Sequence, residues 1–135
     1  MPGNVLPVAK DGMTPVTSLA VTTATSGNVA ASVATATLAA PAVVGIVNYL
    51  TGFEVTGAGA TAASVIAVTV TGCLGGTFTY QMAIVAGATL AQPALIVAFP
   101  RALQASGPNV AISVSAASFG AGNTNACVNA HGYAQ

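Results

Sequence analysis

The sequence predicts an all-β fold, namely an antiparallel β-sandwich or jelly roll with an extended N-terminal arm. Short runs rich in β-branched residues alternate polar and apolar side chains with a period near two, which is typical of half-buried strands. Clusters of Gly, Pro, Asn and Ser separate these runs and indicate turns. Seven or eight short strands with such turns suit two packed antiparallel sheets, and the 135 residues fit a single domain.

The first 27 residues differ from the rest of the chain. Pro2, Pro7 and Pro15 lie there among many Gly, Thr and Ser residues. Proline removes a backbone donor and interrupts helices and long strands. We therefore expect an extended arm over residues 1–27, which could become ordered on a neighbouring subunit, and a β-sandwich domain over residues 28–135.

The sandwich domain contains seven candidate strands. Residues 29–42 are the ambiguous segment, because their alanines suit a helix whereas their β-branched residues and the stop at Pro41 favour a strand. Residues 94–99 form a short apolar run that is expected to end at Pro100. The predicted strands cover residues 29–38, 43–55, 64–71, 77–85, 94–99, 109–115 and 124–130.

Ionised side chains are unusually scarce. Charged residues make up 3% of the chain and the net charge is zero, whereas about 25% is typical of soluble domains. Because there is no basic patch, the sequence predicts no nucleic-acid partner and no binding to an anionic membrane surface. Such a surface suits a protein that packs against other subunits. The four ionised residues are Lys10, Asp11, Glu54 and Arg101.

The mean hydropathy of +0.80 raises the question of a membrane segment. The most apolar window, residues 82–99, is interrupted by Gly87, Thr89, Gln92 and Pro93. A membrane-spanning helix needs about 20 predominantly apolar residues, so we expect none. The N-terminus also lacks a basic segment followed by an apolar one, and we expect no secretory signal.

The chain offers little catalytic chemistry. Residues 57–62 match the glycine-rich dinucleotide pattern G-x-G-x-x-A, but a strand rather than a helix is predicted to follow, and no acidic residue lies downstream. This segment is therefore predicted to be a loop that binds no cofactor. Asp11, Glu54 and His131 are far apart, and no pattern brings them together. We expect no catalytic residue, no metal site and no small-molecule substrate.

Four charged residues are candidates for contacts between subunits. Glu54 and Arg101 could pair within the subunit or across a contact, and we expect at least one of them to lie at an interface, where an isolated charge sets the register. Lys10 and Asp11 lie in the predicted arm. Cys73 and Cys127 could form one disulfide or remain reduced thiols.

Sugar binding is a further alternative to weigh. Sugar sites usually present exposed aromatic side chains beside carboxylates and amides. The chain has only three tyrosines, four phenylalanines and two acidic residues, so most of its rings are expected in the core or in interfaces. Tyr133 and residues 123–129 could nevertheless form a small polar patch.

Five short stretches resemble small virion proteins of tailed bacteriophages, namely capsid decoration or cement proteins. The resemblance covers residues 45–133 and does not include the segment before residue 28. The matching stretches are residues 49–57 (YLTGFEVTG), 72–78 (GCLGGTF), 95–100 (LIVAFP), 120–126 (GAGNTNA) and 131–133 (HGY).

The resemblance implies a β-sandwich or jelly roll, often trimeric, on the outside of a head shell at junctions between capsomers. It implies no catalytic residues. We therefore expect a structural protein that is made in the host cytoplasm and stabilises a bacteriophage head as a homotrimer by bridging major capsid subunits. The alternative is a carbohydrate- or host-surface-binding module of a fibre or tail.

Overall fold

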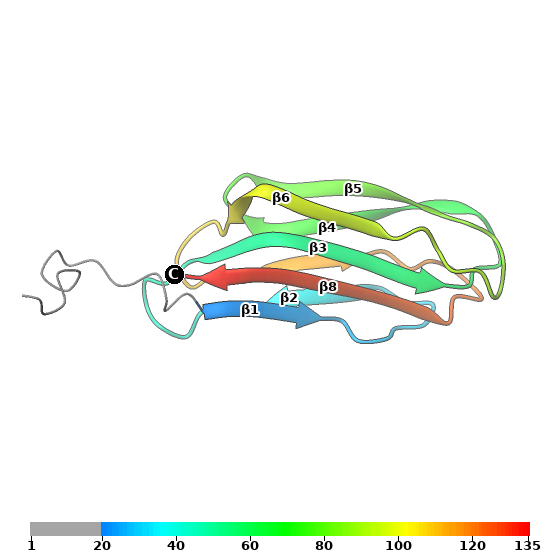
Figure 1. Cartoon of the computed structure of the whole chain (residues 1–135), viewed down its shortest axis with the longest axis horizontal. Helices are drawn as coiled ribbons and strands as arrows, with labels where there is room; N and C mark the ends of the chain where they lie inside the picture. Colours follow the sequence, from blue (N-terminus) through cyan, green and yellow to red (C-terminus); the bar gives the residue numbers. More distant parts are fainter. Residues whose placement is uncertain (1–19) are drawn as a thin grey trace, which may run out of the picture.

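The computed structural model describes residues 20–135, which form a sandwich of two antiparallel four-stranded sheets (Figure 1). These residues contain no helix, and thus none that is long and apolar enough to cross a membrane. The predicted fold class, an all-β antiparallel sandwich, is confirmed. The greater part of the predicted arm, residues 1–19, lies outside the described residues.

Each sheet combines strands from distant parts of the sequence. The first sheet has the order β1-β8-β3-β6 and the second has the order β2-β7-β4-β5. The strands of the first sheet are β1 (Ala20–Thr25), β8 (Asn125–Ala134), β3 (Asn48–Ala58) and β6 (Leu95–Gln104). Those of the second are β2 (Ala34–Leu38), β7 (Ile112–Ala116), β4 (Ser64–Cys73) and β5 (Gly76–Ile84).

The pairing is that of a jelly roll. Strands of the first half of the chain pair with those of the second half in reverse order, β1 with β8, β2 with β7, β3 with β6 and β4 with β5. This arrangement results when a long four-strand-by-four-strand hairpin rolls up. The β3–β8 and β4–β7 pairs then complete the two sheets, as in eight-stranded jelly rolls.

The core consists mainly of small and β-branched side chains from alternate positions of the strands. In β2, for example, Ala34, Ala36 and Leu38 are buried while Thr35 and Thr37 are exposed, as the period of two requires. The largest fully buried side chains are Phe53, Phe119, Leu38, Leu50, Ile84 and Ile112.

The boundary predicted at residue 28 is misplaced, because the sandwich begins earlier. Residues 20–25 form β1, which pairs with β8 from Ala20↔Ala134 to Thr25↔Asn129. Ser26 and Gly27 follow the end of this strand, and Gly27 has a φ of +65°, which suits a turn. The predicted arm and the sandwich therefore overlap over these six residues.

The predicted end of a strand at Pro100 is also wrong. β6 continues through Pro100 to Gln104 because it is an edge strand, where proline leaves no ladder partner unsatisfied. Its register with β3 shifts between Leu50↔Leu103 and Gly52↔Ala98, so residues 99–102 bulge out of the ladder. A bulge that carries proline and the charged Arg101 protects an exposed edge against pairing with other chains.

The other predicted strands each overlap an observed one. The ambiguous segment 29–42 contains a strand and no helix, but the strand is limited to β2. Residues 43–47 form a loop before β3 rather than its first part, and β8 continues to Ala134 beyond the predicted end at residue 130. Strand positions were thus predicted better than strand ends.

Candidate functional site

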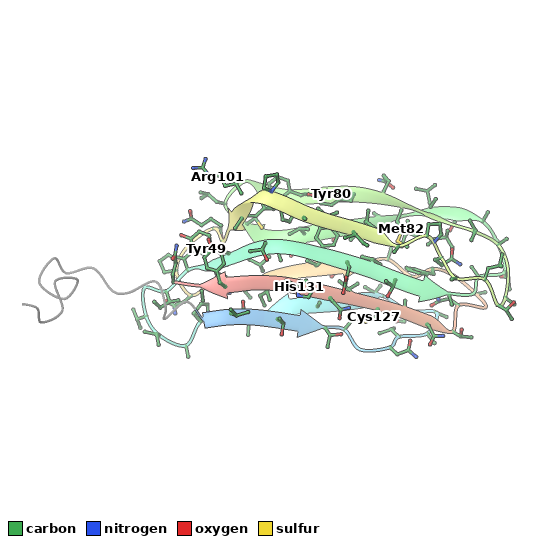
Figure 2. All side chains as sticks on the ribbon, in the orientation of Figure 1. Tyr49, Tyr80, Met82, Arg101, Cys127 and His131 are labelled. Carbon is green, nitrogen blue, oxygen red and sulfur yellow. The ribbon has the colours of Figure 1, made fainter. Side chains whose placement is uncertain are left out.

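Aromatic and polar side chains gather on the outer face of the first sheet. Asn129, His131 and Tyr133 occupy alternate positions of β8 and point outward, whereas the residues between them are buried. Across the ladder, Tyr133 faces Tyr49 and Asn129 faces Glu54 of β3. β8 and β3 are the two central strands of the sheet, and Figure 2 labels Tyr49 and His131 on them. We call these five residues the β3–β8 patch.

Glu54 is held in place by its neighbours on β8. The Asn129 side-chain amide Nδ2 donates a hydrogen bond to Glu54 Oε1 over 3.0 Å. His131 Nε2 lies 3.8 Å from the same oxygen, too far for a hydrogen bond, so the two form an ion pair only when the imidazole is protonated. Their side chains are 39% (Glu54) and 50% (His131) exposed, and such a surface pair contributes about 0–1 kcal/mol.

The expectation that nothing brings Glu54 and His131 together is therefore wrong. The two residues are distant in sequence, and the β3–β8 pairing juxtaposes them, with His131 opposite Gly52 beside Glu54. Gly52 has no room for a side chain, because a Cβ there would lie 2.6 Å from the Val97 carbonyl oxygen. Part of the patch can be predicted from the sequence, because Asn129, His131 and Tyr133 follow one another at a period of two and therefore share one face of a strand.

The tyrosines of the patch stack on each other. The ring centroids of Tyr49 and Tyr133 are 5.0 Å apart and their planes differ by 11°. Elsewhere, Phe53 packs in the core against Tyr80 and Phe99, with centroids 5.3 and 6.2 Å apart. The expectation that most rings lie inside the protein is met, and the stacked tyrosines are the exception.

The two cysteines are free thiols. Cys127 lies next to the patch, where its Sγ is 3.5 Å from Thr25 Oγ1 and 3.7 Å from Asn129 Oδ1. Cys73 is buried at the end of β4, and burial raises the pKa of its thiol. Of the two alternatives left open by the sequence, the structure has the reduced form.

Within the subunit, Arg101 does not pair with Glu54. Glu54 faces Ile96 across the β3–β6 ladder, whereas Arg101 lies in the β6 bulge between the Leu50↔Leu103 and Gly52↔Ala98 pairs. Arg101 is exposed on the β6 bulge, and Figure 2 draws it at the edge of the sandwich. Lys10 and Asp11, the other proposed contact residues, lie outside the described residues.

The glycine-rich segment 57–62 is a loop in part. Residues 57 and 58 end β3, residues 59–62 form the predicted loop, and the next element is strand β4 rather than a helix. Asn123 holds this loop region by donating from Nδ2 to the Ala58 carbonyl oxygen and accepting from the Ala31 amide. Within residues 20–135, no three His, Cys, Asp or Glu side chains come together as metal ligands would.

The outer face of the second sheet has different chemistry. Each of its four strands contributes a Thr/Ser-x-Thr/Ser pair, and most of these residues are paired across the ladder, as Thr35↔Ser115, Thr37↔Ser113, Thr69↔Ser115, Thr71↔Ser113 and Thr69↔Thr79. Thr35 Oγ1 and Ser115 Oγ are 2.7 Å apart, and Thr37 Oγ1 and Ser113 Oγ are 2.8 Å apart. We call this surface the hydroxyl face. It comprises Thr35, Thr37, Ser113, Ser115, Thr69, Thr71, Thr77 and Thr79.

Comparison with protein-family models, with curated proteins and with solved structures gives no match to this chain. Fold and surface chemistry are therefore the observations that bear on its function. Fold alone does not define a function, because jelly rolls serve many roles.

Proposed function

We propose that this chain is a structural virion protein that decorates and stabilises a bacteriophage head. In this role it bridges major capsid subunits as a homotrimer on the outer surface of the shell. The jelly-roll strand order supports the proposal by analogy, since viral capsid domains use it. The observation that carries the proposal is a rigid apolar surface at one end of the sandwich.

This apolar surface lies at the end where β1 begins and β8 ends, on the left in Figure 1. We call it the terminal end. Val43 and Val44 in the β2–β3 loop are 67% and 89% exposed, and Leu74 in the β4–β5 turn is 66% exposed. The loops of this end, residues 39–47, 74–75 and 105–111, contain no ionised residue. Val43 and Val44 are neighbours in the β2–β3 loop, and adjacent exposed apolar side chains of this kind mark a candidate interaction site.

The β2–β3 loop is held rigidly by one side chain. Asn109 Nδ2 donates to the carbonyl oxygens of Pro41 and Val43 over 2.6 and 2.7 Å, and the Gly45 amide donates to Asn109 Oδ1 over 3.1 Å. Asn109 itself has a φ of +58°, which asparagine tolerates better than most residues. A loop that is already ordered loses little entropy on binding, which favours a docking role.

The N-terminal segment joins the sandwich at this same end, since β1 begins there. In the proposal, residues 1–19 act as a tether and contact the same capsid partner as the exposed valines. Lys10, Asp11 and the exposed Arg101 are the charged contacts. Glu54 accepts a hydrogen bond from Asn129 within the subunit. Of the two charged residues of the sandwich, Arg101 is therefore the better candidate for fixing how the subunit is positioned on its capsid partner.

The test is to replace Val43 and Val44 by serine and to count the copies bound to purified particles. Burial of each valine is worth roughly 1.5 kcal/mol or more, so occupancy at limiting protein should fall at least about tenfold. Val65→Ser, at the opposite end and similarly exposed, is the matched control. Unchanged occupancy in the Val43/Val44 variant would contradict the proposal.

A truncation tests the tether. Because β1 starts at Ala20, the deletion must stop at residue 19 to leave the sheet intact. Loss of residues 2–19 should weaken attachment to particles by a larger factor than it lowers the free energy of unfolding. Full occupancy after this deletion would remove the tether from the proposal.

The second candidate function is a carbohydrate- or host-surface-binding module of a fibre or tail, and the β3–β8 patch favours it. Labelling of intact particles with an antibody separates the two candidates. Label on the head supports decoration, whereas label confined to the tail supports the second candidate.

A further inference from the structure

We infer that the β3–β8 patch binds a neutral saccharide. The inference goes beyond the proposed attachment to a capsid and does not depend on it, because the patch lies on a sheet face and the terminal end is a separate surface. It rests on the arrangement of one carboxylate, one amide, one imidazole and two stacked phenol rings on the central strands of one sheet.

The patch is accessible and rigid. Glu54 and His131 keep two-fifths to one-half of their side-chain surface exposed, and both project from central strands that are paired on each side. The hydrogen bond from Asn129 fixes the Glu54 carboxylate without covering it. A site held this way loses little side-chain entropy when a ligand binds.

Unused hydrogen-bonding capacity in the patch matches that of a polyol. Glu54 receives the Asn129 bond on Oε1, and within residues 20–135 its Oε2 accepts no hydrogen bond. A carboxylate can accept from two neighbouring hydroxyls, while imidazole and phenol groups both donate and accept. Sugar hydroxyls also do both, so each free group of the patch has a complementary partner on a saccharide.

The stacked tyrosines supply the apolar part of the site. Tyr49 and Tyr133 form a pre-formed pair of stacked rings, each of which carries a hydroxyl, and such side chains bury a large surface at low entropic cost. The C–H groups of one pyranose ring can pack against this aromatic pair, while the hydroxyls of the neighbouring sugar units of the same oligosaccharide reach His131, Glu54 and Asn129.

The charge of the patch selects a neutral ligand. Glu54 is the single acidic residue of the patch, and Arg101 lies outside the patch on the edge bulge. An anionic saccharide would therefore be repelled by Glu54, while His131, the one group of the patch that can become a cation, already faces the Glu54 carboxylate. A neutral saccharide avoids this cost.

The length of the patch indicates an oligosaccharide and weak binding per site. From Asn129 to Tyr133 the outer face of β8 extends about 14 Å, at 3.4 Å per residue. A shallow surface of this kind gives modest affinity, and many copies on one particle would raise the avidity. Lectin domains with the jelly-roll fold provide a fold-level analogy.

The experiment is a glycan array with the purified full-length protein, followed by titration calorimetry. The array carries neutral oligosaccharides of glucose, galactose, mannose and N-acetylglucosamine, together with sialylated and sulfated ones. We expect binding to at least one neutral oligosaccharide and none to the anionic set. Absence of binding to every neutral oligosaccharide, or binding only to anionic ones, would overturn the inference.

Variants locate the site. Tyr133→Ala and Glu54→Gln should each weaken the neutral oligosaccharide at least about tenfold, Tyr133→Phe should retain most of the affinity, and Thr69→Ala on the hydroxyl face should change nothing. Each variant is first checked for an unchanged far-UV spectrum and elution volume. Unaltered affinity in both patch variants, or a patch variant that changes the oligomeric state instead, would assign the patch to another role.

Discussion

The two outer faces of the sandwich are built by the same alternation of side chains and yet have different chemistry. On the hydroxyl face, the hydroxyls of Thr35 and Thr37 form hydrogen bonds with those of Ser115 and Ser113 across the ladder, so like groups pair with like groups. On the opposite face, the β3–β8 patch combines unlike groups, several with capacity to spare. A nearly uncharged protein can thus use short hydroxyl side chains to stay solvated and reserve its few distinctive residues for one surface.

The face that carries the patch depends on a close contact beneath it. Gly132 lies on the inner side of β8, and a Cβ there would collide with the Tyr49 carbonyl oxygen and approach Leu38 Cδ1 to 2.8 Å. Gly132→Val should therefore separate β8 from β3 and lower the free energy of unfolding by about 3 kcal/mol or more. Urea denaturation measures this, and wild-type stability in the variant would mean that the strands are not so close.

The two cysteines should differ in reactivity, because Cys127 lies near the surface and Cys73 lies in the core. Cys127 is half-buried on the patch side, whereas Cys73 is buried and its pKa is raised by burial. A raised pKa leaves less thiolate at any pH below it, so Cys73 should react with iodoacetamide at pH 8 at least about a hundredfold more slowly than Cys127.

Mass spectrometry of the labelled protein identifies the site. The Cys127→Ser variant, which should lose the fast phase, is the control. Equal labelling rates for the two cysteines would show that the end of β4 opens readily.

The stacked tyrosines should contribute to stability as well as to binding. Tyr133→Ala removes the ring pair, worth about 0.5–1.5 kcal/mol, together with some buried area. The expected loss is about 1–2 kcal/mol in the free energy of unfolding, and Tyr133→Phe should cost less than half of that. Equal losses in the two variants would indicate that the phenol hydroxyl, rather than the stacked ring, provides the stability.

The smallest effect is expected on the hydroxyl face. Thr35→Val removes an exposed hydrogen bond to Ser115 but keeps a β-branched side chain, so stability should change by less than about 0.5 kcal/mol. Solubility should fall instead, because the face loses a polar group. A loss of stability above about 1 kcal/mol would show that the hydroxyl ladder holds the second sheet together.

The sequence predicts the sandwich well because the relevant signal is local. Alternation within β2, β4 and β7 shows directly which side chains face inward. β1 was missed since its signal is short and follows a segment rich in proline, and β6 was cut short because proline is tolerated on an edge strand. Both errors have the same cause: whether a segment pairs as a strand, and whether that strand lies at a sheet edge, depends on distant parts of the chain that a short window of residues does not include.

The patch was harder to predict than the fold. Asn129, His131 and Tyr133 share a strand face by simple periodicity, but Glu54 and Tyr49 join them only through the β3–β8 register. That register depends on which strands become neighbours in the jelly roll, and on the irregularity at Gly52. The apolar terminal end likewise depends on Asn109, whose role in holding a loop 64 residues away in sequence has no local signature.

A cryo-EM reconstruction of the purified particle would show how this protein is attached. We expect density for it on the outer surface of the head, with the loop of residues 39–45 against the major capsid protein and the β3–β8 patch uncovered. Density at the tail alone, or a sandwich attached through its sheet faces with the terminal end exposed to solvent, would contradict the proposal.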